Sequence, residues 1–241
     1  MKIHNVEQGT QEWKRLRAEY LTASNAPAMM GESRFKSRNQ LIHEVATGEI
    51  PEVNPAQQRN FDRGHEAEEA ARAVLQMETL DEYPPLVASV EVDDLPLLAS
   101  FDGFCQERGE LWEHKLWNES LAKAVRTGNL PEEYCYQLEH QLLVAEGHAD
   151  RVEFVVSDGT MEKRCPMTYY SVPERRAKLI AGWKRFVEDV KNYKPKAKVE
   201  QAQGVDADGF PLVEYEIKGT AIYSNLRDIL PLAKERAQEE M

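Results

Sequence analysis

The chain has 241 residues, enough for one ordinary domain with additions or for two small domains. About 41% of its residues are apolar and 30% are charged, which is typical of a folded protein and excludes a disordered one. Its 42 acidic and 30 basic residues give a net charge of −12, which excludes a nucleic-acid-binding coat over the whole surface but not a local basic groove.

No apolar run approaches the ~18 residues of a membrane span, and the first residues contain no apolar leader segment. The three cysteines, Cys105, Cys135 and Cys165, are too few and too scattered for a disulfide framework or a zinc site. We therefore expect reduced cysteines and a cytoplasmic location.

The first elements expected along the chain are helical. Periodic apolar residues predict helices over 10–17, up to Met30, over 38–47 and over 64–76, with a loop over 51–55. Thr22 or Ser24 could cap the second of these helices, and Gly48 is expected to end the third.

A block of alternating apolar and polar residues follows. It predicts strands over 86–92, 97–101 and 111–116, with Gly103 and Gly109 in the turns between them. A helix over 132–145, opened by Pro131 at its first position and ended by Gly147, comes next. Two strands over 151–157 and 167–172 and an amphipathic helix over 177–193 complete the pattern. This order predicts an α/β (α+β) fold with a central mixed sheet flanked by helices.

The last part of the chain consists of a basic segment followed by an acidic one. Residues 174–198 carry nine basic and three acidic residues, whereas residues 199–241 carry four basic and nine acidic residues. We therefore expect a main domain over 1–198 and an acidic C-terminal extension over 199–241, with a strand over 212–218 and a short polar helix at the end.

The sharpest local pattern joins two acids and a lysine. Asp102 ends one apolar strand, and Glu113 and Lys115 lie two positions apart on the next, so both point to one face of the sheet. Mg²⁺ favours carboxylate oxygens, polarises a phosphoryl oxygen and activates water. A lysine beside it can orient or deprotonate that water. The order Asp, Glu, Lys therefore indicates metal-assisted phosphodiester hydrolysis.

Alone, this pattern is weak, because an acid two residues before a lysine occurs four times. The pairs are Glu12–Lys14, Glu113–Lys115, Asp189–Lys191 and Glu216–Lys218. The last is a competitor, since Asp206 and Asp208 precede it in a polar loop. An exposed strand with a surface ion pair explains the Glu113 pattern about as well. The nearby acids Glu107, Glu110 and Glu119 are expected to be solvated.

Further motifs in the same order support the catalytic interpretation. They are Trp13 to Arg17, Leu21 to Ser24, Gly64-x3-Glu68 and Tyr134-x2-Gln137. Together with Asp102, Glu113 and Lys115 they resemble the YqaJ-type viral recombinase family, the lambda exonuclease-like members of the PD-(D/E)XK nucleases. The resemblance covers about residues 8–172, and the tail after about residue 198 has no counterpart in it.

The resemblance implies a restriction-endonuclease-like nuclease domain over 1–198 that uses Mg²⁺, for which Mn²⁺ can substitute. It implies an alkaline exonuclease that hydrolyses one strand of double-stranded DNA from 5′-phosphorylated ends in the 5′→3′ direction. The remaining 3′ single strand would then be used for annealing-type recombination. It further implies a homotrimeric ring, a single-strand annealing protein as partner, and a phage or prophage origin.

The residues that match the family's motifs are expected to have the roles known for that family. By resemblance, Asp102 and Glu113 are metal carboxylates, and the backbone carbonyl of His114 is a further ligand. Lys115 is the catalytic lysine, Glu68 lies near a second metal, and Gln137 supports the lysine and the water. Glu68 could otherwise be a solvated helix acid. Gln137 shares a helix face with His140 and Gln141, and a polar stripe of this kind more often faces solvent.

Arg17 and Ser24 match the family's 5′-phosphate-binding residues. An arginine offers a bidentate fork to phosphate, and a serine at a helix start adds a hydroxyl. Lys14 or Arg15 could take the place of Arg17. The basic stretch over 175–198 and the residues Arg34, Lys36 and Arg38 are candidate contacts for the DNA backbone, although the former could be a solvated helix face.

Two other functions remain open at this point. One is an endonuclease of the same fold, which needs no pocket for a DNA end. The other is a catalytically inactive module that binds DNA ends or proteins, against which the complete set of matched residues counts.

Overall fold

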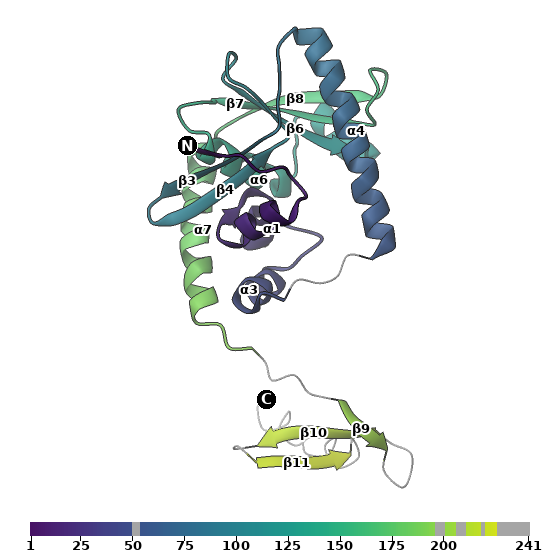
Figure 1. The fold of residues 1–241 in the computed structure, drawn as a ribbon, viewed down its shortest axis with the longest axis vertical. Helices are drawn as coiled ribbons and strands as arrows, with labels where there is room; N and C mark the ends of the chain where they lie inside the picture. The colour runs from purple at the N-terminus through teal and green to yellow at the C-terminus, as the bar shows by residue number, and fades with distance from the viewer. Residues whose placement is uncertain (50–53, 196–200, 206–210, 218–219, 226–241) are drawn as a thin grey trace. The chain divides into compact units, whose positions relative to one another are not determined.

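The computed structural model describes residues 1–49, 54–195, 201–205, 211–217 and 220–225, with side chains up to residue 195. The chain divides into two compact units, Met1–Tyr193 and Lys194–Met241. Figure 1 traces both units from the N-terminus to the C-terminus. No helix of the described part is long and apolar enough to cross a membrane.

Two four-stranded sheets form the centre of the first unit. The first sheet has the order β1-β3-β4-β2, with β1 Lys2–His4, β2 Leu21–Thr22, β3 Leu86–Val92 and β4 Leu95–Phe101. The second has the order β5-β6-β7-β8, with β5 Gly103–Cys105, β6 Glu110–Leu116, β7 Arg151–Ser157 and β8 Arg164–Tyr170. The β2–β4 and β6–β7 pairs are parallel and the others antiparallel. The expected mixed α/β class is therefore confirmed, with the strands distributed over two mixed sheets.

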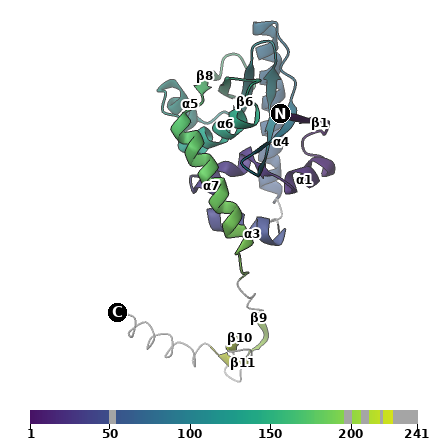
Figure 2. The ribbon, with the colours of Figure 1, turned by 90° about the vertical axis from the view of Figure 1, so that its left-hand side faces the viewer.

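The helices surround these sheets. They are α1 Gln11–Ala18, α2 Ala26–Met30, α3 Arg38–Thr47, α4 Pro55–Thr79, α5 Glu119–Arg126, α6 Glu132–Val144 and α7 Pro173–Lys191, with a short 3-10 helix over Ala23–Asn25. In Figure 1, α4 runs along one side of the first unit, where it contacts β6. Helix α7 lies across α6 and continues past α3 (Figure 2).

Local capping explains several boundaries. Ser37 and Gln40 form a capping box at the start of α3, and Gly48 ends that helix with a positive φ, as expected. Helix α4 starts nine residues before the predicted Gly64, because Asn54 caps it and Pro55 opens it. The predicted loop is therefore wrong at Pro55, while residues 51–53 lie outside the described chain.

Other expectations need correction. Neither Thr22 nor Ser24 caps the helix over Ala26–Met30; Thr22 ends β2 instead. Gly103 lies in β5, where it pairs with Trp112 of β6, rather than in a turn. A Cβ there would lie 3.0 Å from Tyr83 Cβ, so the close approach of Tyr83 accounts for the glycine. Pro131 precedes α6 as its capping residue instead of occupying the first helical position.

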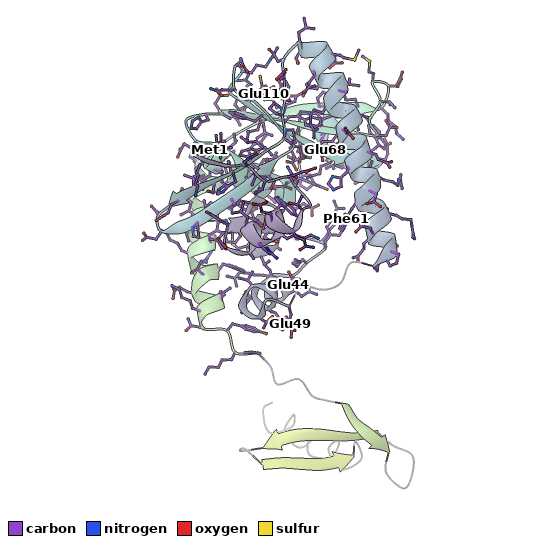
Figure 3. All side chains as sticks on the ribbon, in the orientation of Figure 1. Met1, Glu44, Glu49, Phe61, Glu68 and Glu110 are labelled. Carbon is purple, nitrogen blue, oxygen red and sulfur yellow. The ribbon has the colours of Figure 1, made fainter. Side chains whose placement is uncertain are left out.

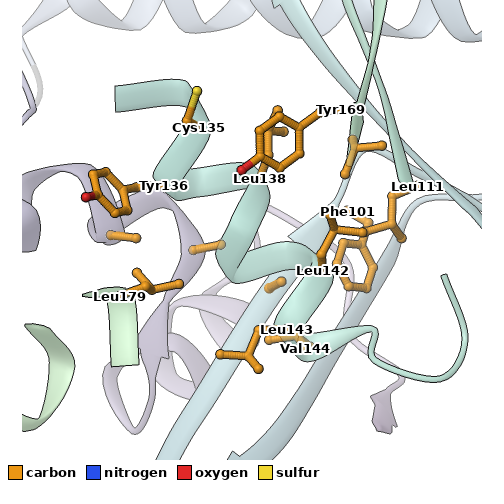
Figure 4. Close-up of a cluster of buried hydrophobic side chains, with 14 of the residues drawn as sticks. Phe101, Leu111, Cys135, Tyr136, Leu138, Leu142, Leu143, Val144, Tyr169 and Leu179 are labelled. Atoms are coloured by element: carbon orange, nitrogen blue, oxygen red, sulfur yellow. The ribbon is translucent and has the colours of Figure 1, made fainter. Parts of the chain in front are cut away.

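Helix α6 lies at the centre of the main hydrophobic core. Its buried apolar side chains pack against the sheets and against Leu179 of α7, and Figure 4 shows part of this cluster. Members on three elements, Phe101, Leu138 and Leu179, are each at most 1% exposed. Burying one such side chain contributes ~1.5–3 kcal/mol, so the core holds α6 firmly against the strands that carry the predicted site.

The second unit contains an antiparallel sheet in the order β11-β10-β9. Its strands are β9 Gln201–Val205, β10 Pro211–Ile217 and β11 Thr220–Asn225. Strand β10 begins one residue before the strand predicted over 212–218, and position 218 lies outside the described residues. The competing acid–lysine pattern at Lys218, with its loop acids Asp206 and Asp208, and the expected terminal helix lie outside the described residues.

Candidate active site

Asp102 occupies the junction between the two sheets, after the end of β4 and before the start of β5. Its Oδ2 accepts a hydrogen bond from the backbone N–H of His114 on β6 at 2.9 Å. This bond links the junction to β6 and fixes the carboxylate beside the strand that carries the next two predicted residues.

Glu113 and Lys115 lie on the same face of β6, as their spacing predicts. Lys115 Nζ donates to Oε1 of Glu113, and Nε2 of Gln137 on α6 donates to the same oxygen at 2.7 Å. Nε2 of Gln141 donates to the other oxygen, Oε2, at 2.6 Å. The structure therefore brings the predicted Glu113, Lys115 and Gln137 into direct contact and adds Gln141, a contact that sequence reasoning missed.

The polar stripe of α6 faces the protein interior. Both His140 and Gln141 are at most 1% exposed, so the interpretation of this stripe as a solvent face is wrong. These residues are buried because each has a hydrogen-bond partner in the tertiary structure. The amide of Gln141 donates to Glu113, and Trp183 Nε1 donates to His140 Nδ1 at 3.1 Å. Both partners come from other elements and leave no signal in the periodicity of α6.

The side chain of His114 points to the opposite face of β6. Its ring stacks on Trp112 with 5.6 Å between centroids, and its Nε2 lies 2.9 Å from Ser157 Oγ. Burial lowers the pKa of the His114 imidazole to about 4, so the ring is neutral near pH 7. The ring therefore has partners of its own, Ser157 and Trp112, and the predicted role of His114 at a metal site concerns its backbone carbonyl.

Glu68 lies on α4, on the side facing the strands (Figure 3). Nη2 of Arg72, one helical turn later, donates to Glu68 Oε1, and Nε of Arg72 donates to the backbone carbonyl of Asp102 at 3.0 Å. Arg72 thereby connects α4 to the Asp102 junction. Sequence reasoning missed this arginine, although its spacing of four residues after Glu68 was a usable signal.

Burial and neighbouring carboxylates raise the pKa values of two acids at this site, Asp102 and Glu68. The pKa of Asp102 lies well above its ordinary value because of burial and of the neighbouring Glu113 and Glu68. Burial also raises the pKa of Glu68, where Arg72 opposes and Glu113 adds to the shift. Burial alone would lower the pKa of Lys115, but Glu113 and Asp102 raise it above its ordinary value. The site therefore has a strongly negative potential around one ammonium group.

The donor chemistry of these acids fits a hard divalent cation, since all three offer carboxylate oxygens in a negative potential. Asp102 and Glu113 would hold the ion, with the His114 carbonyl as a further oxygen and Glu68 nearby. Among the residues that the structure describes, however, no three His, Cys, Asp or Glu side chains form a group that could hold a metal ion. In the described arrangement Glu113 is satisfied by Lys115 and the two glutamines instead.

Arg17 and Ser24 lie together at the edge of the first sheet. Nη2 of Arg17 donates to Ser24 Oγ at 2.8 Å, and the guanidinium lies 4.4 Å over the ring of Trp13. Nε1 of Trp13 donates to Oγ of Ser100, two residues before Asp102, at 2.9 Å. The alternatives Lys14 and Arg15 are exposed, so the geometry favours Arg17 as the arginine of this pair.

Of the three surrounding acids expected in solvent, Glu107 and Glu119 are exposed but Glu110 is buried. Its carboxylate accepts hydrogen bonds from Tyr83 Oη at 2.6 Å and from Arg151 Nε at 2.8 Å. The expectation for Glu110 is therefore wrong, because a tyrosine and an arginine from distant segments compensate its burial.

The two basic segments expected to contact DNA are largely paired with acids. The pairs are Arg34–Glu133, Lys36–Glu44, Arg38–Asp189, Arg175–Glu132, Arg176–Glu139, Lys184–Asp93 and Lys191–Glu188. Phosphate contacts by these side chains would have to compete with these acids. Residues 196–198 of the second segment lie outside the described chain.

Comparisons with known proteins identify the family that this chain matches and solved structures that resemble its fold. Residues 12–148 match the family model of the YqaJ-like viral recombinase domain. The crystal structure of the alkaline exonuclease LHK-Exo from Laribacter hongkongensis has a TM-score of 0.62 and 24% identity, covering 76% of this chain and 93% of that chain. Its complex with dAMP has a TM-score of 0.59 and 23% identity with the same coverage. At this identity the likeness establishes the fold. No curated protein sequence gives a significant match.

Proposed function

The chain belongs to the YqaJ-like viral recombinase domain family, and we propose that it is a Mg²⁺-dependent exonuclease that degrades one strand of duplex DNA from 5′-phosphorylated ends in the 5′→3′ direction. The observation that carries this proposal is the contact of Lys115 and Gln137 with Glu113, beside the junction at Asp102. The alkaline exonuclease LHK-Exo, which shares the fold, supports an exonuclease as the class of enzyme.

Each residue has a chemical task in this proposal. A bound Mg²⁺ would polarise the scissile phosphate and lower the pKa of a bound water. Asp102 and Glu113 supply carboxylate oxygens, and the ammonium of Lys115, whose pKa is raised by these acids, orients the attacking water by a hydrogen bond. Gln137 donates to Glu113 Oε1 and so keeps this oxygen beside the ammonium of Lys115.

The Arg17–Ser24 pair supports the proposed 5′→3′ direction of degradation, because it offers a site for a 5′-phosphate. Arg17 can present its remaining N–H groups to a terminal phosphate, while its contact with Ser24 and Trp13 holds the guanidinium in place. An enzyme that starts at a 5′-phosphorylated end needs such a pocket, whereas an endonuclease of the same fold does not. The pair therefore favours the exonuclease over the endonuclease.

The decisive experiment uses linear duplex DNA labelled at one end, with either a 5′-phosphate or a 5′-hydroxyl, in the presence of Mg²⁺. We expect rapid loss of nucleotides from the phosphorylated 5′ end and slow loss from the hydroxylated one. Internal cuts that ignore the end would favour an endonuclease. Binding to DNA without any cleavage would favour an inactive module.

Two features of the proposal concern assembly. A homotrimeric ring and a single-strand annealing protein as partner follow from the family resemblance, and light scattering of the purified chain tests the first of them. A monomer across the micromolar range would remove the ring from the proposal. Co-migration with an annealing protein encoded beside this chain tests the second.

A further inference from the structure

Gln141 lies one helical turn after Gln137 on α6, and the two amides bind opposite oxygens of one carboxylate. Nε2 of Gln137 lies 2.7 Å from Glu113 Oε1, and Nε2 of Gln141 lies 2.6 Å from Glu113 Oε2. Both Gln141 and Glu113 are 1% exposed. The last torsion of a glutamate side chain is otherwise broad, so this two-point contact sets the plane of the Glu113 carboxylate.

The distribution of donors distinguishes the two oxygens of Glu113. Oε1 accepts from both Lys115 and Gln137, whereas Oε2 accepts from Gln141 among the described residues. A carboxylate offers about four acceptor positions, two on each oxygen. Oε2 is therefore the oxygen that retains an acceptor position, and Gln141 determines where that position points.

Packing alone does not account for a glutamine at position 141. Its Oε1 is buried and has no hydrogen-bond partner in the described part of the chain. A buried acceptor without a donor costs ~1–3 kcal/mol. Turning the amide over would place its oxygen against Glu113 Oε2, so the contact with Glu113 dictates the orientation of the amide. A methionine would fill a similar space without this cost, which leaves the contact with Glu113 as the reason for the amide.

We propose that Gln141 is a positioning residue that orients Glu113 Oε2 for a divalent cation. It acts through Glu113 and contacts neither the ion nor the DNA. This inference rests on the proposed nuclease function, because Glu113 is a metal carboxylate in that proposal. Removal of groups that hold a metal ligand in place typically lowers metal affinity or activity ~10–100-fold.

The test measures Mn²⁺ binding to the full chain by calorimetry without DNA. The variants are Gln141→Met and, as a matched control, Leu138→Met, a fully buried position on the same helix. We expect Mn²⁺ affinity to fall by ~10–100-fold in Gln141→Met and to stay within about twofold in Leu138→Met. The Mg²⁺ concentration for half-maximal cleavage should rise in Gln141→Met, while the rate at saturating Mg²⁺ recovers most of the wild-type value.

A second variant, Gln141→Asn, covers the case in which the methionine variant does not fold. It keeps the amide but is one methylene too short to reach Glu113, so we again expect weaker Mn²⁺ binding. Wild-type Mn²⁺ affinity in either folded variant would overturn the role of Gln141 and leave the nuclease proposal intact. A wild-type chain that neither binds Mn²⁺ nor cleaves DNA would overturn the proposed function itself.

Discussion

Nη2 of Arg17, at the end of α1, donates a hydrogen bond to Oγ of Ser24 at 2.8 Å. Burial lowers the pKa of this guanidinium, which indicates that it is poorly hydrated although it remains charged at neutral pH. A poorly hydrated cation that is already fixed by a hydroxyl and by the ring of Trp13 loses little freedom when an anion binds. The arrangement suits the recognition of a terminal phosphate.

We predict that Arg17→Ala removes the preference for phosphorylated ends. Hydrogen bonds to charged groups contribute ~1.5–3 kcal/mol, so the rate on 5′-phosphorylated duplex should fall ~10–100-fold while the rate on 5′-hydroxyl duplex changes little. The measurement is the ratio of initial rates on the two substrates. Arg15→Ala, on an exposed position of the same helix, is the matched control and should keep the ratio. An unchanged ratio in Arg17→Ala would place the phosphate elsewhere.

We predict that Lys115→Ala abolishes cleavage and leaves DNA binding largely intact. A positioned acid–base group contributes ~10²–10⁴-fold to rate, whereas one ammonium adds little to affinity for a polyanion. Cleavage and gel-shift assays on the same duplex separate the two effects. Two lysines in the same sequence pattern serve as controls, Lys191 on the surface of α7 and Lys218 in the second unit. Activity retained in Lys115→Ala, or lost in Lys218→Ala, would contradict the assignment.

His140 provides a prediction about pH and stability. Burial lowers the pKa of its imidazole to about 3, from an ordinary value of 6.5. Below pH ~6.5 the unfolded chain therefore binds a proton that the folded chain excludes, and the free energy of unfolding falls by up to ~1.4 kcal/mol per pH unit as the pH decreases toward the folded value. Above pH ~7 the imidazole is neutral in both states, so His140 no longer lowers the free energy of unfolding.

Urea unfolding between pH 7 and pH 4.5 measures this dependence. The variant His140→Gln should show a shallower decrease than the wild type, although His114, with a pKa of about 4, contributes a similar slope to both. The exposed His148→Gln is the control and should follow the wild type. Parallel curves for His140→Gln and wild type would show that the pKa of His140 is the same in the folded and the unfolded chain.

Two glycines are predicted to respond in opposite directions to alanine. A Cβ at Gly103 would lie 3.0 Å from Tyr83 Cβ and 3.3 Å from Trp112 Cβ, so Gly103→Ala should destabilise the fold by ~1–3 kcal/mol. A Cβ at Gly64, inside α4, meets open space, so Gly64→Ala should stabilise it by up to ~1 kcal/mol. Thermal unfolding measures both, and a neutral Gly103→Ala would mean that β5 moves to accommodate the methyl group.

Much of the fold could be read from local patterns. The strand over 86–92 and the helix over 38–47 agree with β3 and α3 at both ends, because alternation and a capping box are properties of adjacent residues. Helix α5 was missed, although the Asn118 side chain caps it and its buried Leu121 and Val125 lie four residues apart, which are signals of the same local kind. Strands β1 and β2 were missed because two or three residues carry no period and pair only with β3 and β4.

The sequence by itself determined that Glu113 and Lys115 share one face of a strand and that Asp102 directly follows an apolar strand. Strand geometry alternates side chains between faces, so a spacing of two residues is sufficient for the first conclusion, and the end of the apolar run at Phe101 is sufficient for the second. Only the tertiary structure decided that Gln141 and Glu110 are buried, because their partners come from segments distant in the chain. A polar residue is compatible with water or with a buried partner, and periodicity alone does not distinguish these two environments.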